Sequence, residues 1–146
     1  MERIEKMGLK QMIKKSWKVM LLAACLVIMF SLSSFANTRY TATLEGKGSS
    51  WKSSELAYLR CRLKGNKMIL NGDMFEIDEN NQRIRRVHFN NKKIKLSKKV
   101  KYRSANAESG EFKGSRKDVI KATKNGFIGM DLEMKGGKIV KIIIHA

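Results

Sequence analysis

The sequence predicts a mainly β protein: a small antiparallel β-sandwich or meander barrel of about 7–9 strands that follows an N-terminal signal peptide. Short runs of strand length alternate between apolar and polar residues, and turn-forming pairs of Gly and Asn separate them at intervals of about 8–12 residues. Proline is absent, so the turns must come from residues that accept a positive φ angle. The pairs are Gly65-Asn66, Asn71-Gly72, Asn80-Asn81, Asn90-Asn91, Asn125-Gly126 and Gly136-Gly137.

The first 36 residues have the composition of a secretory signal peptide. A basic segment precedes an apolar run from Val19 to Phe30, and small residues stand one and three positions before a cut after Ala36. The apolar run is shorter than the about 20 residues that a membrane-spanning helix needs. We therefore expect residues 1–36 to be a signal peptide, or 12–36 if Met12 is the true start, and the protein to reach the periplasm, cell surface or extracellular space.

A lipid anchor is an alternative, because residues 22–25 spell the Leu-Ala-Ala-Cys box that precedes lipidation of a cysteine. Cleavage before Cys25 would leave an apolar stretch at the new N-terminus, where a polar tether is usual. Cleavage at the later site removes Cys25 and leaves Cys61 alone, so no internal disulfide is expected in the mature chain. Its place between Leu59 and Leu63 in an alternating run predicts that Cys61 is buried and inert.

Residues 37–146 are expected to form a single basic β domain, since a chain of 110 residues makes one ordinary small domain. This part holds 25 Lys and Arg against 11 Asp and Glu, a formal net charge of +14. Such a charge draws a protein toward anionic polymers and membrane surfaces, while it says little about the fold.

The clearest predicted strands lie at the two ends of this domain. Tyr40, Ala42 and Leu44 alternate with polar residues, as expected for a strand with one buried face. The run 138–145 is apolar on both faces, which predicts a central strand. We expect it to pair with 129–134 through the Gly-Gly turn between them.

Two segments fit either a helix or a strand. Ser53 to Gly65 has a possible N-cap and a terminal glycine, but its apolar residues fit a strand face equally well. Ser115 to Thr123 carries Asp118 in the position of a capping box. We favour strands for both, in the second case because Asn125-Gly126 follows as a hairpin turn.

The chain offers few groups for catalysis or metal binding. His88 and His145 are the only histidines, and neither has a partner at a recognisable spacing. A Cys61–His88 pair would be a nucleophile with its base, but such residues coexist in most proteins. Paired Cys or His spacings typical of zinc sites are missing. We therefore expect no enzyme activity, cofactor or metal.

The most distinctive feature is a basic stretch with no acidic residue between Glu79 and Glu108. On a hairpin it would form a cationic surface that binds phosphate polymers through counterion release. The candidate anion-binding residues are Arg83, Arg85, Arg86, Lys92, Lys93, Lys95, Lys98, Lys99, Lys101 and Arg103.

These observations favour an exported, non-enzymatic binding protein whose basic sheet face holds an anionic envelope component: a phosphate polymer, lipid head groups or extracellular nucleic acid. One alternative is a structural or protein-interaction module, such as an inhibitor or assembly factor, in which the charge gives solubility or steers a protein partner. Another is a small barrel that carries a lipid.

Overall fold

The computed structural model describes residues 8, 10–22, 37–46 and 52–145. The chain divides into two units, Met1–Ala36 and Asn37–Ala146. In the first unit, residue 8 and residues 10–22 are helical. The candidate lipidation site Cys25 and the cleavage site after Ala36 lie outside the described residues. Among the residues described, no helix has the length and apolar character needed to cross a membrane.

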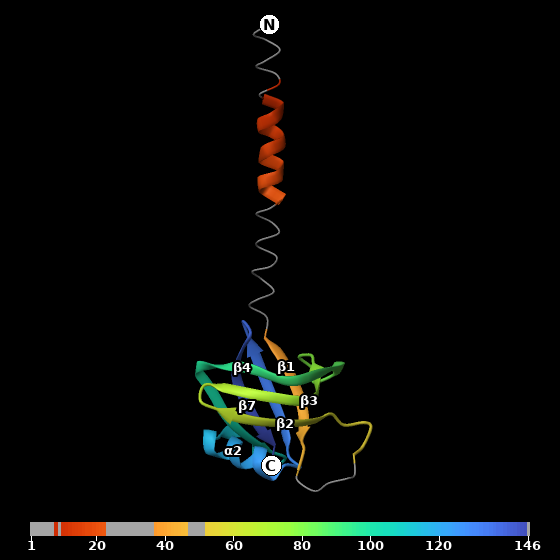
Figure 1. Ribbon diagram of the computed structural model, residues 1–146, viewed down its shortest axis with the longest axis vertical. Coiled ribbons are helices and arrows are strands. Elements are labelled where there is room, and N and C mark those ends of the chain that lie inside the picture. Colours follow the sequence, from red (N-terminus) through yellow and green to blue (C-terminus); the bar gives the residue numbers. More distant parts are fainter. Residues whose placement is uncertain (1–7, 9, 23–36, 47–51, 146) are drawn as a thin grey trace. The chain divides into compact units, whose positions relative to one another are not determined.

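The second unit is mainly β, as predicted, and its seven strands belong to one sheet (Figure 1). Its described elements are β1 Thr38–Leu44, β2 Tyr58–Lys64, β3 Lys67–Ile77, β4 Arg83–Asn106, β5 Gly110–Lys113, α2 Arg116–Asn125, β6 Gly129–Lys135 and β7 Lys138–His145.

Five of these strands close into a barrel. Going round it, β1 pairs with β3, β3 with β4, β4 with β7, β7 with β6, and β6 again with β1. The β4–β7 pair is parallel, and the others are antiparallel. This order, with a helix before β6, is the topology of the OB fold, a five-stranded Greek-key barrel. Many unrelated functions are built on that fold, so the function must be argued from the site.

β2 lies in the wall of the barrel where β1 and β3 part, on the same edge of β3 that β1 occupies further along. It runs antiparallel to β3 along its whole length, and its first residues also pair in parallel with β1. Figure 1 shows β2, β3 and β4 side by side across one face of the barrel, with α2 at one end. This three-stranded face carries the candidate site described below.

Side chains fill the interior of the barrel. The fully buried side chains include Leu44, Leu59, Met68, Leu70, Met74, Val119, Met130, Leu132, Ile139 and Ile142. The predicted inward face of β1 is confirmed, since Ala42 and Leu44 are buried. The predicted central strand is also confirmed, because β7 lies between β6 and β4 and pairs with β6 through the Gly-Gly turn.

Of the two ambiguous segments, the first ends in a strand and the second is a helix. Residues 58–64 form β2, which confirms the strand prediction there. The strand prediction for 115–123 is wrong, because Ser115 caps α2. Its side chain accepts a hydrogen bond from the Asp118 N–H, and the Asp118 carboxylate accepts one from the Ser115 N–H. This capping box satisfies backbone donors at the start of the helix, while Val119 and Ala122 bury one face of it.

Two of the predicted turn pairs lie inside strands instead. Asn71-Gly72 belongs to β3 and Asn90-Asn91 to β4, where the register shifts so that both β4 asparagines lie opposite Asn71. Gly72 has a φ of 125° and Asn91 a φ of 48°. These positive values serve a β-bulge rather than a hairpin turn. The Asn125-Gly126 pair ends α2 instead of joining two strands.

Candidate functional site

The ten candidate anion-binding residues all lie on β4, but this strand passes from one neighbour to another. From Arg83 to Lys95 it pairs with β3, and from Leu96 to Ala105 it pairs with β7. Lys92, Lys93 and Lys95 therefore belong to the β3 side, whereas Lys101 and Arg103 belong to the β7 side. Lys98 and Lys99 lie in the register shift between the two.

Arg83 and Arg86 contact the Phe75 ring on β3 and the backbone of the segment that precedes β2. Their guanidinium carbons lie 4.2 and 4.9 Å from the centroid of the Phe75 ring. Arg83 donates to the Glu55 carbonyl oxygen at 2.7 Å, and Arg86 donates to that of Ser54 at 3.0 Å. Both arginines hold the segment that precedes β2 against β3, which leaves them fewer donors for a ligand.

The other two arginines of the set are held by ion pairs, as Arg86 also is by Asp73. Arg85 pairs with Glu76 on β3. Arg103 Nε lies 3.0 Å from Glu111 on β5, which also binds Lys141 at 2.8 Å. These contacts hold the pKa of Glu111 below its usual value, with the hydrogen bond from Lys141 the largest cause. Such pairs neutralise the arginines by bringing in carboxylates from other strands.

The lysines differ from the arginines, because no ion pair found within the described ranges involves them. All six are exposed: Lys92, Lys93, Lys95, Lys98, Lys99 and Lys101. Their positive charges are therefore available to a ligand. The strand pairing decides which of them act together.

The outer surface of β2, β3 and β4 gathers cations from all three strands. Lys93 lies opposite Ile69, which lies opposite Arg62. Paired residues in adjacent strands are about 5 Å apart, so their side chains are neighbours. We call the following set the basic face: Arg60, Arg62 and Lys64 from β2, Lys67 from β3, and Lys93 and Lys95 from β4.

Four members of the basic face surround a cavity of about 350 Å³. We call this cavity the basic pocket; its lining residues are Arg62, Lys64, Asn66, Lys67, Ile69 and Lys93. The lining contains no carboxylate. Like charges around one cavity repel each other, and an anion placed among them would relieve that repulsion.

The four members from β2 and β3 are not among the anion-binding residues that the sequence predicts. The pattern that could have found the β2 residues is present, because Arg60, Arg62 and Lys64 alternate with residues that face the core. What the sequence does not give is the pairing of β2 with β3 and of β3 with β4, which joins them to Lys93.

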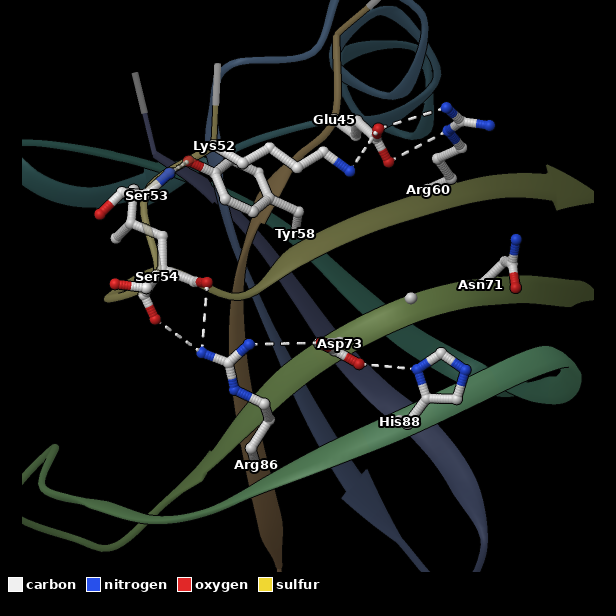
Figure 2. A pocket seen from close by; sticks show the side chains of 12 residues that line it. Glu45, Lys52, Ser53, Ser54, Tyr58, Arg60, Asn71, Asp73, Arg86 and His88 are labelled. Carbon is white, nitrogen blue, oxygen red and sulfur yellow. Dashed lines mark hydrogen bonds and ion pairs between the residues drawn. The ribbon is translucent and has the colours of Figure 1, made fainter. Parts of the chain in front are cut away.

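A second cavity of about 540 Å³ adjoins the basic pocket on the same sheet surface; we call it the polar pocket. Its lining is Glu45, Lys52, Ser53, Ser54, Leu56, Tyr58, Arg60, Asn71, Gly72, Asp73, Arg86 and His88. Figure 2 shows its two carboxylates, each held between two side chains that contact it through nitrogen atoms.

Glu45 lies 2.9 Å from the Lys52 ammonium and 3.1 Å from Arg60 Nε. Asp73 lies 2.7 Å from His88 Nδ1 and 3.3 Å from the Arg86 guanidinium. Lys52, above all, lowers the pKa of Glu45, and His88 does the same for Asp73. Both carboxylates are therefore ionised near neutral pH and serve as hydrogen-bond acceptors.

Both histidines have carboxylate partners that their sequence spacing did not reveal. His88 lies directly across from Asp73 in the β3–β4 ladder, and His145 Nε2 lies 2.8 Å from Asp131 on β6. Cys61 and His88 do not form a pair of nucleophile and base. Cys61 packs against the core, with its sulfur 3.9 Å from that of Met130, whereas His88 contacts Asp73. Burial raises the pKa of the Cys61 thiol to about 12, so the thiol stays protonated at neutral pH.

No group of three or more His, Cys, Asp or Glu residues that could hold a metal ion occurs in the described part of the chain. No family model matches this chain, and neither the curated proteins nor the solved structures provide a match. The features of the described residues that bear on function are therefore the two pockets and the basic face.

Proposed function

We propose that this protein is an exported, non-enzymatic binding protein whose basic face holds a phosphate-bearing polymer of the cell envelope. The observation that carries the proposal is the basic pocket, where Arg62, Lys64, Lys67 and Lys93 line one cavity without a carboxylate. Arg60 and Lys95 extend the same surface beyond the cavity. A linear polyanion matches a positive surface of this kind, because each bound phosphate releases condensed counterions.

The aromatic side chains beside this face favour a ligand that is recognised through its phosphates rather than through bases. Base stacking needs an open ring face. Arg83 and Arg86 lie over the Phe75 ring, and the Lys52 ammonium lies 5.6 Å from the centroid of Tyr58. A phosphate polymer without bases therefore fits this surface better than a single-stranded nucleic acid.

The filled interior argues against a lipid-carrying barrel as the alternative. Side chains such as Leu70, Met74 and Ile142 are fully buried in the core. The two pockets described above open instead on the outside of β2 and β3. The export part of the proposal rests on the basic and apolar composition of residues 1–36.

The salt dependence of binding tests the proposal. Immobilised linear inorganic polyphosphate serves as the probe, and the dissociation constant is measured by biolayer interferometry between 50 and 200 mM NaCl. Six contacts to a single-stranded polyanion predict a slope of about −4 in log K against log salt, a loss of affinity of roughly 250-fold over this range. No binding at 50 mM NaCl, or a slope near zero, would contradict the proposal and favour a protein-interaction module.

A further inference from the structure

The polar pocket adjoins the basic pocket, and the two differ in chemistry. Arg60 and Arg62 are alternate residues of β2; Arg60 lines the polar pocket and Arg62 lines the basic pocket. On β3, the alternate residues Asn71 and Ile69 likewise line the polar pocket and the basic pocket, respectively. Alternate residues of a strand lie about 6.6 Å apart. One repeat unit of a polymer can therefore place a phosphate in the basic pocket and its neighbouring group in the polar pocket.

We infer that the polar pocket binds the hydroxyl groups of a polyol phosphate or sugar phosphate polymer, whose phosphate occupies the basic pocket. This inference rests on the proposed function and names the class of polymer. It assigns the polar pocket to the uncharged part of the repeat unit and the basic pocket to the charged part.

Charge balance separates the two pockets. In the polar pocket, Lys52 and Arg60 neutralise Glu45, while Arg86 and His88 bind Asp73. In the basic pocket the cations have no such carboxylate among the lining residues. A phosphate is therefore attracted more strongly to the basic pocket than to the polar pocket. The polar pocket is left to a neutral group, which does not have to compete with phosphate there.

Hydrogen-bonding groups suit the polar pocket to hydroxyls. Each ionised carboxylate offers about four lone-pair sites, so Glu45 and Asp73 can accept from a ligand hydroxyl while they keep their ion pairs. The hydroxyl of Ser54 and the amide of Asn71 add groups that both donate and accept. Among the described residues, neither side chain has a hydrogen-bond partner, and Figure 2 shows Asn71 apart from the two ion-paired clusters.

The test compares two polymers of equal phosphate number: linear polyphosphate, which has no hydroxyl or carbon backbone, and poly(glycerol phosphate). The variants are Asn71→Ala and, separately, Ser54→Ala. Each is expected to weaken poly(glycerol phosphate) binding about 5-fold, the effect of one lost hydrogen bond, and to change polyphosphate binding less than about 2-fold. Asn80→Ala, the same chemical change in an exposed turn outside both pockets, should alter neither affinity.

The outcomes separate this inference from the proposed function. Equal losses for both polymers, or no loss for either, would overturn the assignment of the polar pocket while polyphosphate binding persists. Tighter binding of single-stranded poly(U) than of poly(glycerol phosphate) would also overturn it and assign the surface to nucleic acid. Failure of the unmodified protein to bind either polymer would instead overturn the proposed function.

Discussion

Reversal of two charges on the basic face, Lys93→Glu with Lys95→Glu, is expected to weaken polyphosphate binding about 100-fold at 100 mM NaCl. The first substitution places a carboxylate in the lining of the basic pocket, and the second places one directly across from Lys67. Two attractive contacts are lost, and two repulsive ones replace them. Biolayer interferometry with immobilised polyphosphate measures the change, and the slope against salt should become shallower as well.

Lys98→Glu with Lys99→Glu is the matched control. It changes the net charge by the same amount on the same strand, but these two residues lie where β4 passes from β3 to β7. They line neither of the two pockets. This control variant should bind within about 3-fold of the unmodified protein, because only long-range attraction is reduced. Equal losses in the two variants would mean that net charge, and not the basic face, determines binding.

Substitution of Gly72 by alanine is expected to lower the free energy of unfolding by about 3 kcal/mol, because strained backbone and a steric clash combine. Gly72 has a φ of 125°, which side chains rarely permit. An added Cβ would lie 2.4 Å from the Tyr58 carbonyl oxygen and 3.2 Å from the Leu59 Cα. Both of these atoms belong to the backbone of β2, so relief requires β2 to move away from β3. Urea unfolding measures the loss.

Gly65→Ala provides the comparison. Gly65 also has a positive φ, 59°, but an added Cβ there meets no atom within 4 Å. Only the cost of the left-handed backbone remains, about 1 kcal/mol. Similar losses in the two variants would show that the clash with β2 does not matter. A larger loss for Gly72→Ala would confirm that the close approach of β2 to β3 at this position contributes to stability.

The position of β2 also matters for binding, because it places Arg60 and Arg62 beside Asn71 and Ile69. These contacts join the two pockets into one surface. A protein in which β2 has shifted should retain its net charge while losing the lining of both pockets.

Strands with one buried face were predictable because alternation reports directly on burial. Tyr40, Ala42 and Leu44 alternate in this way, and Ala42 and Leu44 are buried. The central position of β7 was also predictable, since a strand that is apolar on both faces must be covered on both. In both strands, the pattern of apolar and polar residues along the strand itself was enough to predict which faces are buried.

Predictions from local sequence were wrong where the same pattern of residues fits two kinds of secondary structure. The apolar residues of 115–123 fit a strand or a helix, and the capping box of Ser115 and Asp118 decided for the helix. Asn71-Gly72 and Asn90-Asn91 supply positive φ angles, which turns and bulges both use. Strand pairing decided for the bulge, and pairing is not a local property.

The candidate site was predictable only in part, for the same reason. The basic stretch of β4 was visible in the sequence, but its arginines bind carboxylates or carbonyl groups that come from distant segments, such as Glu76 and Glu111. Its lysines are divided between two neighbouring strands. The partners that complete the basic face, such as Arg62 and Lys67, depend on the register of β2 with β3.

The location of the binding surface is measured directly by an NMR titration of the isotopically labelled protein with linear polyphosphate, followed through backbone amide shifts. We expect the largest shifts on the three strands of the basic face, at Arg62, Lys64, Lys67, Lys93 and Lys95. Shifts centred on residues 98–101, or spread evenly over all lysines, would contradict the claim that this face of the barrel binds the polymer.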